Sequence, residues 1–147
     1  MSANNNAPSG NGLRLVAFCC ANSSSKAAEL SKAPFEVDGV NVRLAQLACS
    51  SKIQIVHVLQ ALETGADAVV LWTCPKESCR FGRGCIRAAK RIERARRIVD
   101  QIGLGSERVF YQALDPKNTD ALDAALKDVT EQLAKLGQSP LKNVGVK

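Results

Sequence analysis

Four apolar segments typical of β-strands alternate with four segments typical of helices, and this alternation constrains the fold more than any other feature of the sequence. The predicted strands span residues 13–18, 40–47, 67–72 and 108–114, and the predicted helices span residues 26–32, 53–64, 84–102 and 120–136. Helices between successive strands favour parallel pairing through right-handed crossovers. We therefore predict an α/β fold: an open, flavodoxin-like parallel sheet of about four strands with helices on both faces.

The length and composition of the chain predict a single domain. A chain of 147 residues can bury one sizeable core but is short for two domains. We expect an N-terminal tail over residues 1–12, one domain over 13–137 and a C-terminal tail over 138–147. No apolar run approaches the ~18 residues of a membrane span. The Asn-, Ser- and Gly-rich start lacks the basic and apolar parts of a targeting peptide, so we expect a cytoplasmic protein.

All six cysteines follow a predicted strand. Cys19 and Cys20 follow the first strand, Cys49 follows the second, and Cys74, Cys79 and Cys85 follow the third. The carboxyl ends of parallel strands lie at one edge of the sheet, where ligands of open α/β sheets bind. The absence of a secretion signal and the sizeable core disfavour a disulfide framework. We therefore expect the cysteines to converge at this edge for metal or redox chemistry.

The loop between the third strand and the next helix is the strongest candidate site. Cys74 and Cys79 are separated by four residues, and one proline and two glycines shape the loop up to Cys85. This spacing lets two sulfurs share an iron or zinc centre. The start of the following helix favours anionic sulfur, because its dipole stabilises thiolates. Structural zinc is the alternative, although paired Cys-x2-Cys knuckles are lacking.

The helix after this loop carries the basic charge of the chain. Residues 80–97 contain eight lysines or arginines and one glutamate, whereas the whole chain has a net charge of +6. We predict that this surface docks an acidic partner through Arg87, Arg91 and Arg94. Nucleic acid is the alternative partner. We do not expect it, because aromatic residues make up only 4% of the chain and no nucleic-acid-binding module is recognisable.

The sequence from Leu13 to Leu141 resembles the delta subunit of methyl-viologen-reducing hydrogenase. The resembling features are Phe18-Cys19-Cys20, the turn at residues 47–52, residues 64–69, the Cys74-x4-Cys79 loop, the basic helix, residues 106–109 and residues 136–141. The resemblance implies a non-catalytic electron-transfer subunit. Such subunits relay electrons between a hydrogenase or other dehydrogenase and a heterodisulfide reductase A-like subunit that carries flavin and iron–sulfur clusters.

The resemblance also implies a [2Fe-2S] cluster. It assigns Cys20, Cys49, Cys74 and Cys79 as candidate ligands, with Cys85 and then Cys19 in reserve. The first loop of the family usually holds Cys-x2-Cys, but here Ser23 stands at the second position. A clusterless adaptor that keeps the fold and the docking surfaces is therefore the alternative function. For Cys19 we favour a packing role, because it follows the strand periodicity into one face of the sheet.

Overall fold

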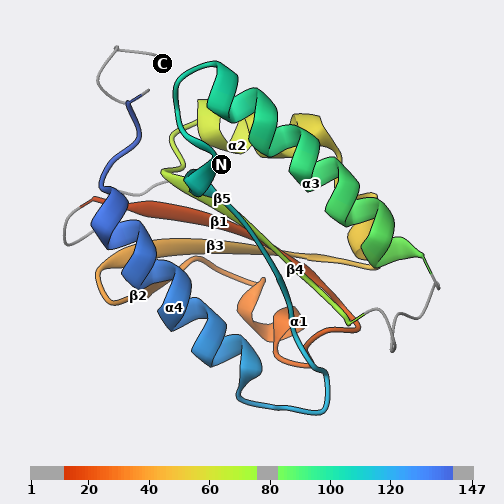
Figure 1. The fold of residues 1–147 in the computed structure, drawn as a ribbon. Helices are drawn as coiled ribbons and strands as arrows, with labels where there is room; N and C mark the ends of the chain where they lie inside the picture. Colours follow the sequence, from red (N-terminus) through yellow and green to blue (C-terminus); the bar gives the residue numbers. More distant parts are fainter. Residues whose placement is uncertain (1–11, 76–82, 141–147) are drawn as a thin grey trace.

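A computed structural model describes residues 12–75 and 83–140 and shows one sheet between two layers of helices (Figure 1). The elements are β1 (Arg14–Cys20), α1 (Ala27–Leu30), β2 (Phe35–Val37), β3 (Val40–Leu47), the 3-10 helix η2 (Ser50–Lys52), α2 (Ile55–Glu63), β4 (Ala68–Thr73), α3 (Gly84–Gln101), the 3-10 helix η4 (Ser106–Arg108), β5 (Val109–Ala113) and α4 (Ala121–Leu136). The predicted α/β class is confirmed. Cys79, the rest of the loop at 76–82 and most of both predicted tails lie outside the described residues.

The sheet has the strand order β2-β3-β1-β4-β5, with β1, β3, β4 and β5 parallel. From β1 the chain first crosses to β3 on one side and then returns past β1 to β4 on the other. The order therefore reverses at β1, between its two neighbours. In open α/β sheets, this reversal is the point at which ligands bind beyond the carboxyl ends of the strands.

The strand β2 was not predicted. It pairs antiparallel with β3 at the edge of the sheet. Asp38 (φ 49°) and Gly39 (φ 82°) connect the two strands, and two left-handed residues match the type I′ turn of a tight hairpin. The sequence predicts the turn at these residues. It does not predict the strand, because three residues are too few for a periodic pattern to show.

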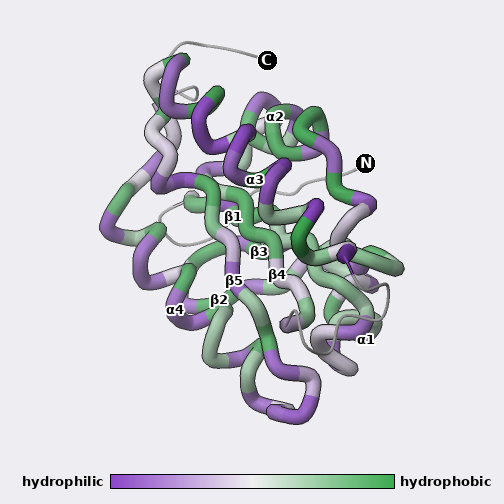
Figure 2. Tube along the Cα trace, turned by 45° about the vertical axis from the view of Figure 1, so that its right-hand side comes forward, coloured by the Kyte–Doolittle hydropathy of each residue, from purple (hydrophilic) through white to green (hydrophobic). Residues whose placement is uncertain are grey.

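The core has two halves, one on each face of the sheet. Alternate side chains of β1 point to opposite faces, so that Leu15 packs with α1 and α4, whereas Val16 packs with α2 and α3. Every residue of β4 is buried. Figure 2 shows the hydrophobic strands at the centre, with hydrophilic residues along the helices. Among the described residues, no helix is long and apolar enough to cross a membrane.

Arg108 holds three segments together at the amino-end edge of the sheet. Arg108 is 6% exposed, and its guanidinium donates to the carbonyl oxygens of Asp67 (3.0 Å) and Gly137 (2.9 Å). Further bonds go to the carbonyls of Leu104, Leu136 and Gln138. One buried cation thus satisfies backbone carbonyl groups at the end of α4, in the residue before β4 and in the loop after α3. A buried charge is tolerated when every donor is hydrogen-bonded.

Asp67 completes the same edge through its carboxylate. It is fully buried and accepts hydrogen bonds from the backbone N–H of Arg14 (2.8 Å) and of Ser139 (2.6 Å). Ser139, which we expected in the C-terminal tail, is only 1% exposed. The first residue of β1 and the chain after α4 are therefore both held at the amino-end edge.

We predict that Arg108→Met lowers the free energy of unfolding by about 3 kcal/mol, because several buried carbonyls lose their donor. Arg108→Lys should recover only part of this loss, because an ammonium group cannot reach the same carbonyls as a planar guanidinium. Urea unfolding followed by circular dichroism measures both effects. Arg43→Met is the matched control, since Arg43 is exposed on β3. Equal stability of the Arg108 and Arg43 variants would contradict the assigned role.

Candidate functional site

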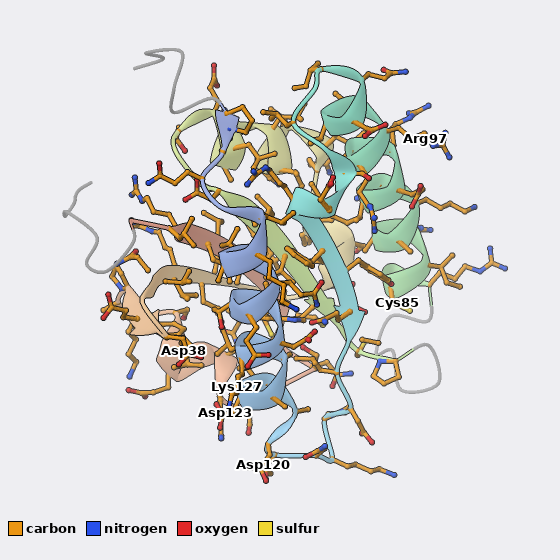
Figure 3. All side chains as sticks on the ribbon, turned by 60° about the vertical axis from the view of Figure 1, so that its left-hand side comes forward. Asp38, Cys85, Arg97, Asp120, Asp123 and Lys127 are labelled. Carbon is orange, nitrogen blue, oxygen red and sulfur yellow. The ribbon has the colours of Figure 1, made fainter. Side chains whose placement is uncertain are left out.

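Four buried cysteines lie at or beyond the carboxyl-end edge of the sheet. Cys20 ends β1, Cys49 follows β3 and Cys74 follows β4, with exposed fractions of 2%, 5% and 2%. Cys85 is 4% exposed in the first turn of α3, where Figure 3 shows it at the start of the helix. None of the five described cysteines forms a disulfide. The edge therefore carries thiols that are shielded from water.

The register of the sheet places Cys20 beside Thr73. Cys19 of β1 lies opposite Trp72 of β4, so the next residue along each strand is also adjacent. Phe18 and Leu71 pack towards α2 and α3. Because side chains alternate along a strand, Cys20 and Thr73 point to that same face. The segment η2 packs against β1, β4 and α3, which brings the turn after Cys49 to this face.

Two buried hydroxyls at this edge have no hydrogen-bond partner among the described residues. They are Oγ1 of Thr73, next to Cys74, and Oγ of Ser50, next to Cys49, and both side chains are fully buried. A buried hydroxyl without a partner costs about 1–3 kcal/mol. An anionic sulfur is an acceptor that would use such donors. The two hydroxyls and the neighbouring thiols therefore match the chemistry of a thiolate-bound metal centre.

The turn after β3 is held in place by α3. Ser51 Oγ donates to Cys49 Sγ at 3.2 Å. The guanidinium of Arg91 donates to the carbonyl oxygens of Ser51 and Ile53, the latter at 3.0 Å. Arg91 is thus a clamp on η2, a role that the charge pattern of the sequence did not reveal.

Cys19 and Ser23 lie on the other face of the sheet from Cys20. Cys19 is fully buried in the core beneath α1 and α4, and this burial raises its pKa to about 11 although the hydrogen bond with Ser23 opposes the shift. Ser23 Oγ lies 3.2 Å from Cys19 Sγ and donates to the carbonyl of Cys20 at 2.7 Å. Both side chains therefore take part in local packing, as we favoured for Cys19, and neither points to the face of the sheet on which Cys20 lies.

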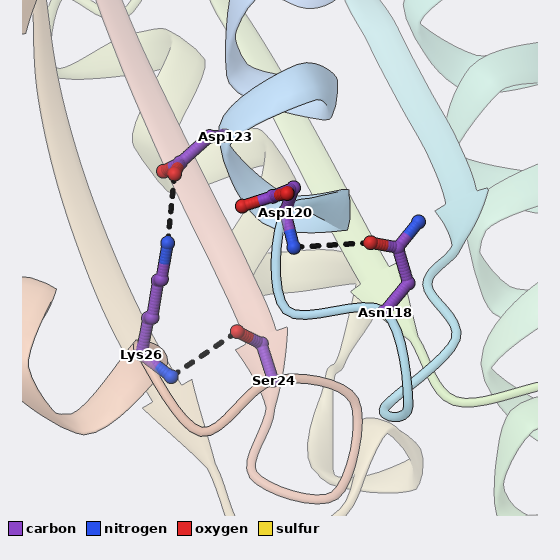
Figure 4. Close-up of polar contacts among 5 residues, drawn as sticks. All are labelled: Ser24, Lys26, Asn118, Asp120 and Asp123. Carbon is purple, nitrogen blue, oxygen red and sulfur yellow. Dashed lines mark hydrogen bonds and ion pairs between the residues drawn. The ribbon is translucent and has the colours of Figure 1, made fainter.

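The first loop is also fixed on the side of α1 and α4 (Figure 4). Lys26 Nζ donates to Asp123 Oδ2 at 2.7 Å, which joins the chain before α1 to α4 and raises the pKa of Lys26. Ser24 Oγ accepts from the backbone N–H of Lys26 (3.2 Å). Asn118 Oδ1 accepts from that of Asp120 (3.0 Å). These contacts order the loops after β1 and β5, and they lie on the opposite face of the sheet from Cys20.

The described side chains do not by themselves form a metal site. Within residues 12–75 and 83–140, no three His, Cys, Asp or Glu side chains gather closely enough to hold a metal ion. Cys20, Cys49 and Cys74 share the carboxyl-end edge of the sheet, and Cys79, the fourth predicted ligand, lies outside the described residues. The complete ligand set stays a prediction.

The predicted docking residues differ in their surroundings. Arg87 and Arg94 are exposed on α3, whereas Arg91 is half-buried and holds η2. Figure 3 shows Arg97 farther along the same helix, with its side chain directed outwards. The two ion pairs in the described part of the chain are Lys26–Asp123 and Lys32–Glu29. The cations of α3 are therefore not neutralised by a described carboxylate.

A family model described as "Methyl-viologen-reducing hydrogenase, delta subunit" matches residues 15–137, which include the whole sheet except the first residue of β1. The chain belongs to this family. The resemblance inferred from the cysteine loops and the basic helix is thus confirmed.

Relatives of known name agree with this membership. The vhu iron-sulfur subunit of the F420-non-reducing hydrogenase of Methanocaldococcus jannaschii is 30% identical over 87% of this chain and 96% of its own length. The subunit of the same name from Methanopyrus kandleri is 28% identical over 84% of this chain and 93% of its own length. In Methanosarcina mazei, the A-type subunit of the ferredoxin:CoB-CoM heterodisulfide reductase is 27% identical over 84% of this chain, but the match spans only 16% of that longer protein.

We predict that Arg91→Met lowers the free energy of unfolding by about 1–2 kcal/mol, because the carbonyls of Ser51 and Ile53 lose a charged donor. Arg94→Met, three residues along the same helix, should change it by less than about 0.5 kcal/mol, as expected for an exposed side chain. Denaturant titration of the two variants in parallel checks the difference. If both variants were equally stable, Arg91 would not be a structural clamp.

Proposed function

We propose that this protein is a cytoplasmic electron-transfer subunit that carries an iron–sulfur cluster, most simply [2Fe-2S], at the carboxyl-end edge of its sheet. It relays electrons between a hydrogenase or other dehydrogenase and a heterodisulfide reductase A-like flavin and iron–sulfur subunit. The observation that carries the proposal is the placement of buried thiols at neighbouring strand ends beside two buried hydroxyls that no described group satisfies.

Cys20, Cys49, Cys74 and Cys79 are the proposed ligands, with Cys85 as first reserve. Cys19 is the weakest reserve, because it lies on the opposite face of the sheet and its pKa is raised by burial. Metal ions commonly assemble their own ligand sets, since thiols become thiolates and draw together only when the metal binds. Ligands that share an edge need only loop movements to meet, and the sheet itself stays fixed.

When bound, an iron–sulfur cluster supplies a one-electron carrier whose potential depends on hydrogen bonds, charge and solvent exposure. The residues of this chain set each of these factors. The buried cysteines would shield a bound cluster from water, and the hydroxyls of Thr73 and Ser50 would be available to donate to its sulfur atoms. The first turn of α3 begins at this edge without a side-chain cap from Arg83, so its N–H groups and dipole also favour negative charge.

The names of the relatives support the proposed partners. One relative is named as a hydrogenase iron-sulfur subunit, and another is a heterodisulfide reductase subunit that contains a segment similar to this chain. A domain that occurs within such a subunit in one organism is suited to bind that kind of subunit when it is a separate chain. We therefore place this protein between these two components.

A clusterless adaptor in the same kind of complex is the second candidate function. Ser23 stands where the family usually has its second cysteine, and its hydroxyl is hydrogen-bonded to the backbone and Cys19. Among the described residues no group of three ligands is assembled. Iron content separates the two functions.

We predict that protein purified without oxygen contains iron and acid-labile sulfide and shows charge-transfer absorption with a reducible paramagnetic signal. Cys74→Ser and Cys79→Ser should each lose most of the iron, because a thiolate ligand is removed. Cys19→Ala is the matched control and should keep it. Iron-free, colourless wild-type protein would favour the adaptor, and full iron in either serine variant would refute the ligand assignment.

We predict that Thr73→Val keeps the iron but lowers the midpoint potential by roughly 40 mV, which corresponds to about 1 kcal/mol for one hydrogen bond in a one-electron couple. The reduced state carries more negative charge and therefore loses more when the donor is removed. Without metal, the same substitution should not destabilise the fold, because no described group pairs with the hydroxyl. Thr130→Val is the control for the fold. Thr130 is also buried, but its hydroxyl donates to the carbonyl of Lys127, so its removal should destabilise the protein. An unchanged potential in Thr73→Val would refute the donor role.

A further inference from the structure

A groove runs between the first turn of α2 and the basic side of α3. One wall is formed by Gln54, Ile55 and Val56, and the other is formed by Lys90, Arg91, Arg94 and Arg97. No acidic side chain lines it. Its α3 wall therefore presents cations at neighbouring positions on one side of a helix.

The positive charge of this groove is not compensated within the described part of the chain. Lys90, Arg94 and Arg97 are spaced four and three residues apart, so their charges repel one another. Both described ion pairs involve other lysines. The positive end of the α2 dipole adds to the same field. An anionic occupant would relieve this repulsion.

The α2 wall adds an apolar feature. Val56 is 51% exposed and is one of two large hydrophobic residues that are exposed in the described structure. Gln54 and His57 close the start of the helix with a capping box, in which the backbone N–H of Gln54 donates to His57 Nδ1 at 3.0 Å. The first turn that presents Val56 is therefore a fixed surface.

We propose that this groove binds an acidic, amphipathic segment of a partner protein. Its carboxylates pair with Lys90, Arg94 and Arg97, and an apolar side chain of the segment packs on Ile55 and Val56. Charge complementarity selects an acidic occupant, and the exposed valine favours a protein segment over a nucleic-acid backbone, which would contact only the cations. Arg91 belongs to the same wall but is held by η2, so it shapes the groove while the other cations are available to pair.

The groove adjoins the turn that carries Cys49. Arg91 lines the groove and also donates to the carbonyl of Ser51, two residues after Cys49. A partner bound here would lie next to the turn that follows Cys49. The inference rests on the proposed function only in that the partner is a subunit of the same complex, because the groove itself requires no cluster.

A labelled synthetic peptide with glutamates on one side of a helical pattern and leucines on the other tests the proposal by fluorescence anisotropy. We expect it to bind the full-length protein, more weakly as salt rises. Lys90→Glu and Arg94→Glu should each weaken binding about tenfold, because attraction becomes repulsion. Val56→Asp should weaken it by a similar factor. Lys127→Glu and Arg43→Glu, which reverse exposed cations on α4 and β3, should leave it unchanged.

Four outcomes would overturn the proposal. The first is binding that is equally reduced by the groove variants and the control variants. The second is equal affinity for a peptide of the same composition with scrambled spacing, and the third is tighter binding of a DNA duplex. The fourth is a concentration-dependent dimer of the protein that Arg94→Glu dissolves, because it would assign the groove to a second copy of the chain. Iron content, measured on the same samples, keeps a failure of the groove separate from a failure of the cluster.

Discussion

The common direction of β1, β3 and β4 is the constraint on which the candidate site depends. Parallel strands in register end together, so the residues that follow each of them meet at one edge. Cys20, Cys49 and Cys74 are brought to this edge by backbone hydrogen bonds between strands, and the lengths of the intervening helices do not affect the result. The reversal of strand order at β1 adds space for a bound group between the strand ends.

The two edges of the sheet differ in how fully their buried polar groups are hydrogen-bonded. At the amino-end edge, Arg108 and Asp67 are almost completely buried, and backbone carbonyls and N–H groups satisfy them. At the carboxyl-end edge, the hydroxyls of Thr73 and Ser50 have no partner among the described residues. Proteins typically accept such local costs at functional sites and offset them elsewhere. One edge thus has its buried charges fully hydrogen-bonded, whereas the other keeps two buried hydroxyls without a described partner.

The sequence predicted the parts of this structure that depend on long patterns. The strand at Val40–Leu47 has the predicted bounds, and the helix that begins at Gly84 ends one residue earlier than predicted, at Gln101. Cys49 and Cys74 follow their strands as expected, whereas Cys19 and Cys20 lie within β1, which extends two residues beyond its predicted end. The pattern could not reveal which groups most single side chains contact. In the sequence, Arg91 resembles the other surface cations of the helix, and only the structure shows its contacts with η2. The alternation along β1 turns Cys19 away from Cys20, but which face carries the other thiols is known only from the structure of the sheet. Thr73 could have been noticed as a polar residue that ends a fully apolar strand.

The anchoring of Ser139 on Asp67, close to the start of β1, means that the polypeptide enters and leaves the domain on the same side. That side is remote from the thiols and from the start of α2. A domain with adjoining ends can be spliced into or onto a longer polypeptide without blocking its working surface. A segment similar to this chain makes up 16% of the much longer Methanosarcina mazei protein, and adjoining ends suit a domain to such an insertion.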